Sequence, residues 1–144
     1  MTEQAKMRRL ILALAVVAVA VAVAPLASAT PRSGTLKADK NCDNYTGLPG
    51  SYCTFYSSNV GWAPAGTNIF YLQPGANSSD VVLDPPGPGN NKAFGHCDLP
   101  DGLNGTCVFS GGTGKFTHFH ATLTVTYLGG PNFHWEGTYG LSPH

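Results

Sequence analysis

The stretch Thr117-His-Phe-His-Ala-Thr-Leu-Thr-Val-Thr-Tyr127, followed after Gly129-Gly-Pro131 by Asn132-Phe-His-Trp-Glu-Gly-Thr-Tyr139, decides the fold class of this chain. Apolar residues alternate with His, Thr and Glu in both segments, and this period of two is typical of half-buried antiparallel strands. The Gly-Gly-Pro sequence between them predicts a hairpin turn. The side chains expected to face the interior are Phe119, Ala121, Leu123, Val125, Tyr127, Phe133, Trp135 and Tyr139.

Further β-rich runs alternate with clusters of Gly, Pro, Asn and Asp along the rest of the chain. No segment keeps a helical apolar period without a Gly or Pro intruding. Regular short strands separated by such turns predict an all-β sandwich or barrel. The expected strands are Tyr52–Ser57, Thr67–Gln73, Asp80–Asp84, Lys92–Cys97, Thr106–Ser110, Lys115–Leu128 and Asn132–Tyr139, with an eighth between Leu36 and Asn44.

The N-terminal segment has the pattern of an export signal. Lys6, Arg8 and Arg9 precede the apolar run Leu10–Ala24, and Ala27-Ser-Ala29 is a small-x-small cleavage site. The apolar run has 15 residues, whereas spanning a bilayer takes roughly 20. We therefore expect residues 1–29 to be a signal peptide and the rest to be secreted and extracellular.

Removal of residues 1–29 leaves 115 of the 144 residues, enough for one domain. Residues 30–41 are polar, contain Pro31 and Gly34, and are expected to be a flexible lead-in to a β domain over residues 42–144. Five Lys and Arg face seven Asp and Glu after residue 29, so there is no basic field to attract nucleic acid. We expect neither a nucleic-acid partner nor membrane association after signal cleavage.

Four cysteines in an exported chain predict two disulfides. Three pairings of Cys42, Cys53, Cys97 and Cys107 exist. Cys42–Cys53 with Cys97–Cys107 is favoured because each pair closes a short local loop, and such a loop stabilises by roughly 3 kcal/mol in the chain-entropy model. Structural zinc is the rival interpretation, but the chain has no Cys-x-x-Cys spacing.

The segments Phe109-Ser-Gly-Gly-Thr-Gly-Lys-Phe116 and His134-Trp-Glu-Gly-Thr-Tyr139 resemble the allene oxide cyclase and dirigent-like β-barrel superfamily, in particular its small exported bacterial members. Those families carry a Gly-Gly-Thr-Gly-(Lys/Arg)-Phe corner before a long strand and a Trp-(Asp/Glu)-Gly-Thr-Tyr ending. The likeness covers Gly95–Tyr139, about a third of the chain. It implies a single closed antiparallel barrel of about eight strands, a mostly apolar cavity, cofactor-free chemistry on a hydrophobic substrate and a homo-oligomer.

The leading functional hypothesis is a small hydrophobic molecule bound in the barrel, with cofactor-free cyclisation or isomerisation as the reaction if the protein is an enzyme. The inward face of the two C-terminal strands has no carboxylate, so the resemblance maps no catalytic residue. A general acid would have to come from Tyr71, Asp80 or Asp84. The side chains expected to line the ligand pocket are Phe119, Tyr127, Trp135, Tyr139 and Tyr71.

Two alternatives remain open. The aromatic side chains could fill a packed barrel, which would suit a non-enzymatic extracellular interaction or envelope protein. His118, His120, His134 and Glu136 could instead hold Zn, Mn or Fe on the outer face if a tight hairpin gathered them. A polar outer sheet face explains the same residues without a metal, and no cofactor is expected.

Overall fold

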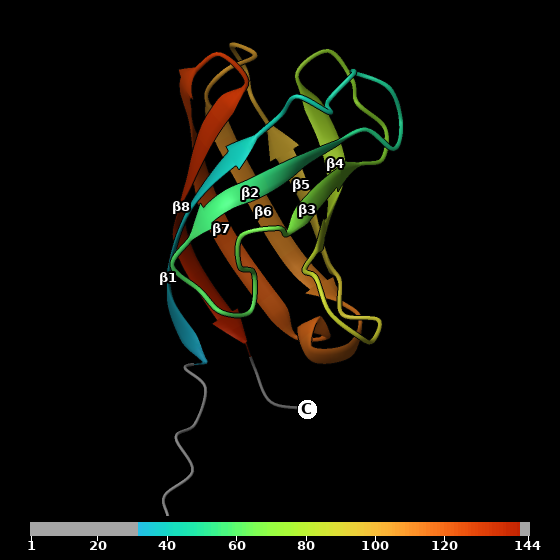
Figure 1. Cartoon of the computed structure of the whole chain (residues 1–144), viewed down its shortest axis with the longest axis vertical. Coiled ribbons are helices and arrows are strands. Elements are labelled where there is room, and N and C mark those ends of the chain that lie inside the picture. The colour runs from blue at the N-terminus through green and yellow to red at the C-terminus, as the bar shows by residue number, and fades with distance from the viewer. Residues whose placement is uncertain (1–31, 142–144) are drawn as a thin grey trace, which may run out of the picture. The chain divides into compact units, whose positions relative to one another are not determined.

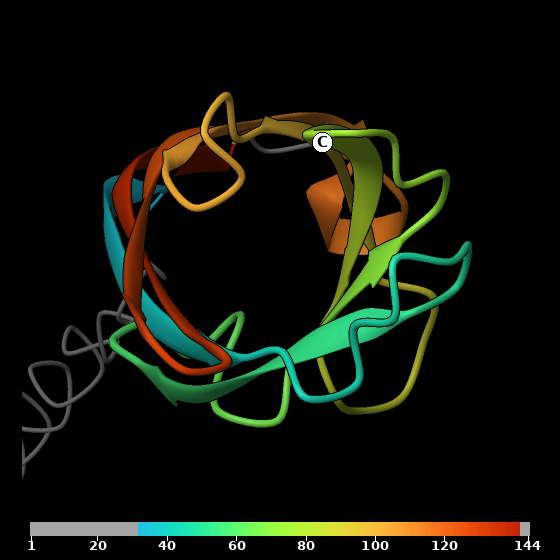
Figure 2. The ribbon, with the colours of Figure 1, turned by 90° about the horizontal axis from the view of Figure 1, so that it is seen from above.

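Eight antiparallel strands follow one another around a closed barrel in the computed structural model, which describes residues 32–141 (Figure 1). The ring of strands is seen from above in Figure 2. The predicted all-β barrel is thus confirmed, while the predicted signal peptide lies outside the described residues. The strands are β1 (Ser33–Asn41), β2 (Tyr52–Ser58), β3 (Asn68–Tyr71), β4 (Ser78–Asp84), β5 (Ala93–Asp98), β6 (Gly105–Gly112), β7 (Phe119–Gly129) and β8 (Asn132–Leu141).

The hairpin of β7 and β8 has the predicted turn and faces. Gly129 and Gly130 adopt φ values of 104° and 55°, in the left-handed region that favours glycine. The register pairs Ala121 with Tyr139 and Val125 with Trp135, so apolar side chains of both strands share the interior. The His and Thr positions between them on β7 are exposed. The alternation in the sequence therefore assigned the two faces of this hairpin correctly.

The expectation of a flexible lead-in over residues 30–41 is wrong from Ser33 onwards. Residues 33–41 form β1, which pairs with β8 from Ser33 opposite Gly140 to Asn41 opposite Asn132 and so closes the barrel. Closure removes the unpaired edges that β2 and β8 would otherwise expose. Leu36 and Ala38 are buried in the interior.

The expected long strand Lys115–Leu128 is shorter at its start. A 3-10 turn occupies Gly114–Phe116, and β7 begins at Phe119. Gly114 has a φ of 55°, and a Cβ there would meet the side chain of Asn91. This glycine corner therefore turns the chain between β6 and β7 instead of extending the strand.

Both favoured disulfides are present. Cys42 bonds to Cys53, and Cys97 bonds to Cys107. Cys97 and Cys107 are direct cross-strand partners of β5 and β6, and both are buried. Two disulfides fit an extracellular or otherwise oxidising compartment. The described residues contain no helix long and apolar enough to cross a membrane.

One end of the barrel interior, here called the closed end, lies where β1 begins and β8 ends and is filled by aromatic rings. Trp62, in the connection between β2 and β3, packs edge-on against three rings. Its ring centre lies 4.8 Å from that of Tyr139, 5.1 Å from Phe119 and 5.9 Å from Phe116. All four side chains are buried. The opposite end, at the β7–β8 hairpin, is here called the open end.

Candidate functional site

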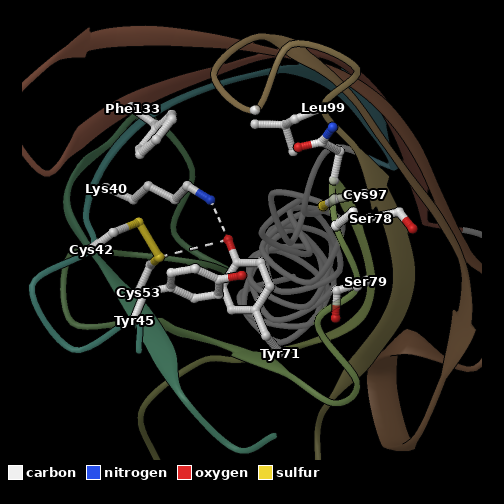
Figure 3. A pocket seen from close by; sticks show the side chains of 14 residues that line it. Lys40, Cys42, Tyr45, Cys53, Tyr71, Ser78, Ser79, Cys97, Leu99 and Phe133 are labelled. Carbon is white, nitrogen blue, oxygen red and sulfur yellow. Dashed lines mark hydrogen bonds between the residues drawn. A yellow bond between two sulfur atoms is a disulfide. The ribbon is translucent and has the colours of Figure 1, made fainter. Parts of the chain in front are cut away.

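A pocket of about 220 Å³ lies at the open end of the barrel (Figure 3). Three connections between strands contribute to its wall, through Tyr45, residues 75–77 and Leu99. Buried side chains from strand ends complete it, among them Lys40 of β1 and Tyr71 of β3. We call this cavity the mouth pocket. It combines apolar and aromatic surface with a few polar groups, as small-molecule sites do.

Lys40 is the most unusual residue of the mouth pocket. It occupies the third inward position of β1 after Leu36 and Ala38, and only 4% of its surface is exposed. Its Nζ lies 2.5 Å from the Tyr71 hydroxyl oxygen and 4.5 Å from the ring centre of Trp135. Within residues 32–141, no carboxylate lies within 4.0 Å of this Nζ. Lys40 is thus buried among aromatic rings, with no carboxylate in salt-bridge contact within this described part of the chain.

Burial changes the acid–base behaviour of both members of this pair. Desolvation lowers the pKa of Lys40 to about 7, because the apolar surroundings disfavour the ammonium form. Burial, with a smaller contribution from Tyr45, holds the pKa of Tyr71 above its usual range. Near neutral pH the pocket therefore contains a substantial fraction of free amine next to a neutral phenol.

The hydrogen-bond directions follow from which atoms carry hydrogens. Tyr71 Oη lies 3.6 Å from Cys53 Sγ, and a disulfide sulfur has no hydrogen, so the tyrosine hydroxyl donates to the sulfur. The Lys40 ammonium can then donate to the Tyr71 oxygen. When Lys40 loses its proton, the Tyr71 hydroxyl can donate to Nζ instead. The pair can therefore move a proton without a large rearrangement.

A primary amine with a lowered pKa can act as a nucleophile or as a general base, and a neutral phenol can act as a general acid. Among the described residues, the titratable side chains that line the mouth pocket are Lys40, Tyr45 and Tyr71. The pocket thus offers amine and phenol chemistry within an apolar wall.

The predicted pocket residues occupy different parts of the molecule. Tyr71 lines the mouth pocket, and Trp135 lies fully buried below it against Lys40. Phe119 and Tyr139 belong to the aromatic packing at the closed end. Tyr127 lies beside the β7–β8 turn, where its hydroxyl donates to the Gly130 carbonyl oxygen at 2.9 Å. Most of the predicted aromatic set is therefore packing, and one member faces the cavity.

Asp80 and Asp84 do not supply an acid to the interior. They alternate along β4 with the buried Val81 and Leu83, so both carboxylates lie on the outer face. Asp80 accepts a hydrogen bond from His96 at 2.8 Å, and that pair is exposed. Of the three acids considered from sequence, Tyr71 alone lines the mouth pocket.

The alternative in which a tight hairpin gathers His118 and His120 with His134 and Glu136 is not supported by the strand register. The register pairs His120 with Gly140, six positions along β8 from His134. At roughly 3.3 Å per residue these histidines lie about 20 Å apart along the strand. An antiparallel hairpin places the start of one strand beside the end of the other. His118 and His120 lie near the start of the first segment, and His134 and Glu136 lie near the start of the second. The hairpin therefore separates the two pairs.

The outer histidine and glutamate of β8 have partners from β1 instead. His134 Nδ1 lies 2.6 Å from an Asp39 carboxylate oxygen, and Glu136 pairs with Lys37 at 3.3 Å. Across residues 32–141, no group of three or more His, Cys, Asp or Glu side chains is arranged to hold a metal ion. These residues support the β1–β8 pairing.

Sequence reasoning missed Lys40 because it took residues 30–41 as a lead-in and assigned no inward face to the eighth strand expected between Leu36 and Asn44. The signal was present: Leu36, Ala38 and Lys40 alternate with Lys37 and Asp39. A strand with Leu36 facing inward places Lys40 inward too.

Comparisons with protein-family models, with curated proteins and with solved structures found no match. The class of protein is therefore defined by the fold and the site themselves. It is a disulfide-bonded, eight-stranded antiparallel barrel with a buried lysine at its open end.

Proposed function

We propose that this protein binds a small, largely apolar molecule with one polar group in the mouth pocket. The observation that carries the proposal is the buried Lys40, which lines the cavity with no carboxylate nearby in residues 32–141. A buried cation without a partner costs stability, and a barrel selected only for packing would gain by an apolar residue at this position. The polar group of the ligand would meet Nζ and the Tyr71 hydroxyl.

The cavity dimension supports a small ligand. Its volume of about 220 Å³ is below the roughly 300–1,000 Å³ of common drug-sized sites. The rings of Phe133 and Tyr45 offer surfaces on which a flat apolar group could pack. If the protein is an enzyme, Lys40 as base and Tyr71 as acid suit a cofactor-free isomerisation or cyclisation.

The proposal includes export and membership of the allene oxide cyclase and dirigent-like superfamily. The leader-like residues 1–29 and the two disulfides support export. The motifs at residues 109–116 and 134–139, together with eight antiparallel strands in a closed barrel, support the family likeness. The alternative is an extracellular interaction or envelope protein with a packed barrel, favoured by the aromatic packing around Trp62.

A pair of serine variants tests the proposal. Ser79 faces inward from β4 and lines the mouth pocket, so Ser79→Phe should fill it. Ser57 is exposed on β2, so Ser57→Phe adds the same ring outside the pocket. The probe is benzyl alcohol, followed by ligand-observed NMR, and native mass spectrometry of the exported protein would reveal a retained ligand.

We expect benzyl alcohol to bind the unmodified protein and Ser57→Phe, and at least tenfold more weakly to Ser79→Phe. Equal binding by all three proteins would place the ligand elsewhere and contradict the proposal. A native mass that contains no retained ligand, together with no binding of benzyl alcohol to the unmodified protein, would favour the packed-barrel alternative.

A further inference from the structure

The mouth pocket holds its amine in surroundings that suit a covalent step. We propose that Lys40 captures small aldehydes or ketones by forming an imine at Nζ. This inference rests on the proposed ligand pocket and names its ligand class. Figure 3 shows the Lys40 amine directed at the Tyr71 hydroxyl, with the Phe133 ring beside its chain.

The first requirement for imine formation is an amine that a ligand can reach but bulk water barely covers. Lys40 lines the mouth pocket, but only 4% of its surface is exposed to solvent. The ring centres of Trp135, Tyr71 and Phe133 lie 4.5, 5.3 and 5.4 Å from Nζ. Aromatic walls limit water around the carbon–nitrogen bond and so slow hydrolysis of the imine.

The second requirement is an unprotonated amine. Desolvation brings the pKa of Lys40 to about 7, so most of this amine is free at about pH 8. Tyr45 and Tyr71 are the other titratable groups that line the pocket among the described residues, and burial keeps Tyr71 neutral at that pH because it holds the pKa of this phenol above its usual range. Lys37 on the same strand is exposed and pairs with Glu136, so it is a natural comparison.

The third requirement is a proton donor for the carbonyl oxygen. The Nζ lone pair attacks the carbonyl carbon, the carbon–oxygen π bond breaks, and the oxygen takes the Tyr71 hydroxyl proton. The nitrogen, which now carries a positive charge, returns one proton to the Tyr71 oxygen and leaves a neutral carbinolamine. Tyr71 then passes a proton to the departing hydroxyl and recovers one from nitrogen. Carbonyl and amine thus give imine and water, and no oxidant or reductant takes part.

The geometry favours a carbonyl compound over a carboxylate ligand. A carboxylate would be attracted mainly to the ammonium form, which burial disfavours. A neutral carbonyl enters an apolar pocket at a lower desolvation cost than an anion. Benzoate is therefore the matched competitor that separates ion pairing from imine formation.

Reductive trapping of the full chain tests the inference. The probe is benzaldehyde with sodium cyanoborohydride at about pH 8, where exposed lysines remain largely protonated. Intact mass and peptide mapping would report a benzyl group in place of one hydrogen and its position. The variants are Lys40→Met, Tyr71→Phe and the control Lys37→Met, and benzyl alcohol binding is measured in parallel.

We expect one benzyl group on Lys40, added several-fold faster than on Lys37 and slowed by benzyl alcohol but little by benzoate. Lys37→Met should leave this labelling intact, Lys40→Met should abolish it, and Tyr71→Phe should slow it. The rate of labelling should rise through about pH 7, as expected for this amine and not for exposed lysines.

The two proposals fail in different ways. Labelling spread evenly over Lys37, Lys92 and Lys115, in a protein that binds benzyl alcohol, would overturn imine formation and leave the pocket standing. Strong competition by benzoate with no Lys40 adduct would show that the pocket binds its ligand by ion pairing, and would overturn imine formation. Absence of both benzyl alcohol binding and Lys40 labelling would overturn both. If Lys40→Met does not fold, peptide mapping of the unmodified protein and competition by benzyl alcohol still decide the outcome.

Discussion

The closed end and the open end of this barrel interior are built from similar aromatic residues but used differently. At the closed end, the ring centre of Trp62 lies 4.8–5.9 Å from those of three other buried aromatic side chains. At the open end, Lys40 and Tyr71 form a polar pair beside a cavity of about 220 Å³. Packing thus dominates one end, while the other retains a costly buried amine. The difference teaches that one small barrel can fill one end of its interior with aromatic rings and keep a buried amine at the other.

The largest effect on stability should come from the closed end. Trp62→Ala removes a buried ring and leaves a cavity, so the free energy of unfolding should fall by roughly 3–5 kcal/mol. Benzyl alcohol should still bind at the open end of the folded variant. Urea unfolding followed by circular dichroism measures the first effect, and ligand-observed NMR the second.

Tyr56→Ala is the control for Trp62→Ala, because Tyr56 is an exposed aromatic residue on the neighbouring β2. Its free energy of unfolding should change by less than about 0.5 kcal/mol. Loss of binding in Trp62→Ala under conditions where the variant is fully folded would show that the two ends are coupled.

The next effect should come from the open end and should have the opposite sign. Lys40→Met replaces a buried amine by an apolar side chain of similar length and should stabilise the protein. The folded pKa of about 7 lies below the unfolded value of 10.5, so the unfolded state binds more protons between these values. Stability of the unmodified protein therefore rises as the pH increases from about 7 towards 10.

The advantage of Lys40→Met should accordingly be greatest below pH 7, at roughly 2–4 kcal/mol, and should shrink at alkaline pH. Denaturant unfolding of both proteins at about pH 6 and about pH 9 measures the change. Lys37→Met is the control, since Lys37 is exposed on the same strand. A constant difference between Lys40→Met and the unmodified protein at both pH values would contradict a buried, titrating amine.

The smallest effect should come from the outer wall. His96 lies between Asp80 at 2.8 Å and Asp98 at 3.2 Å, and the hydrogen bond to Asp80 is the main cause that raises its pKa. Its side chain is 47% exposed, so solvent screening limits the benefit. His96→Gln should lower the free energy of unfolding by roughly 0.5 kcal/mol at about pH 5.

This small contribution has the opposite pH dependence to that of Lys40. A raised folded pKa stabilises the protein below the unfolded histidine value, and the benefit is lost as the pH rises through the folded pKa. The difference between His96→Gln and the unmodified protein should therefore vanish by about pH 9, as denaturant unfolding would show. A loss that stays equal at both pH values would point to packing rather than charge.

The fold was largely predictable because the alternation of apolar and polar residues along a strand indicates which of its faces is buried. The residues of β7 and β8 alternate clearly, and the structure buries Leu123, Val125 and Trp135 as expected. The short loops closed by the two disulfides were also visible as local spacing. β1 was assigned too late in the chain because Pro31, Gly34 and several polar residues obscured an alternation that only closure against β8 makes necessary.

The site was much less predictable. Aromatic residues such as Phe119 and Trp135 suggested a pocket, but composition cannot distinguish a ring that packs from one that lines a cavity. Lys40 is the buried amine of the mouth pocket, but a lysine in a sequence gives no sign that its side chain is buried. The proposed His and Glu patch failed because residue spacing within each strand says nothing about register between them.

The sequence by itself predicted an all-β domain, favoured the two local disulfide pairings that the structure contains, and placed aromatic residues inward on the last two strands. Alternation, turn residues and loop lengths encode these features within a few positions of one another. Only the tertiary structure decided that Trp62 fills one end, that Lys40 meets Tyr71 at the other, and that His120 and His134 lie apart. These outcomes depend on strand register and barrel closure, which join residues distant in sequence and set their burial and their pKa values.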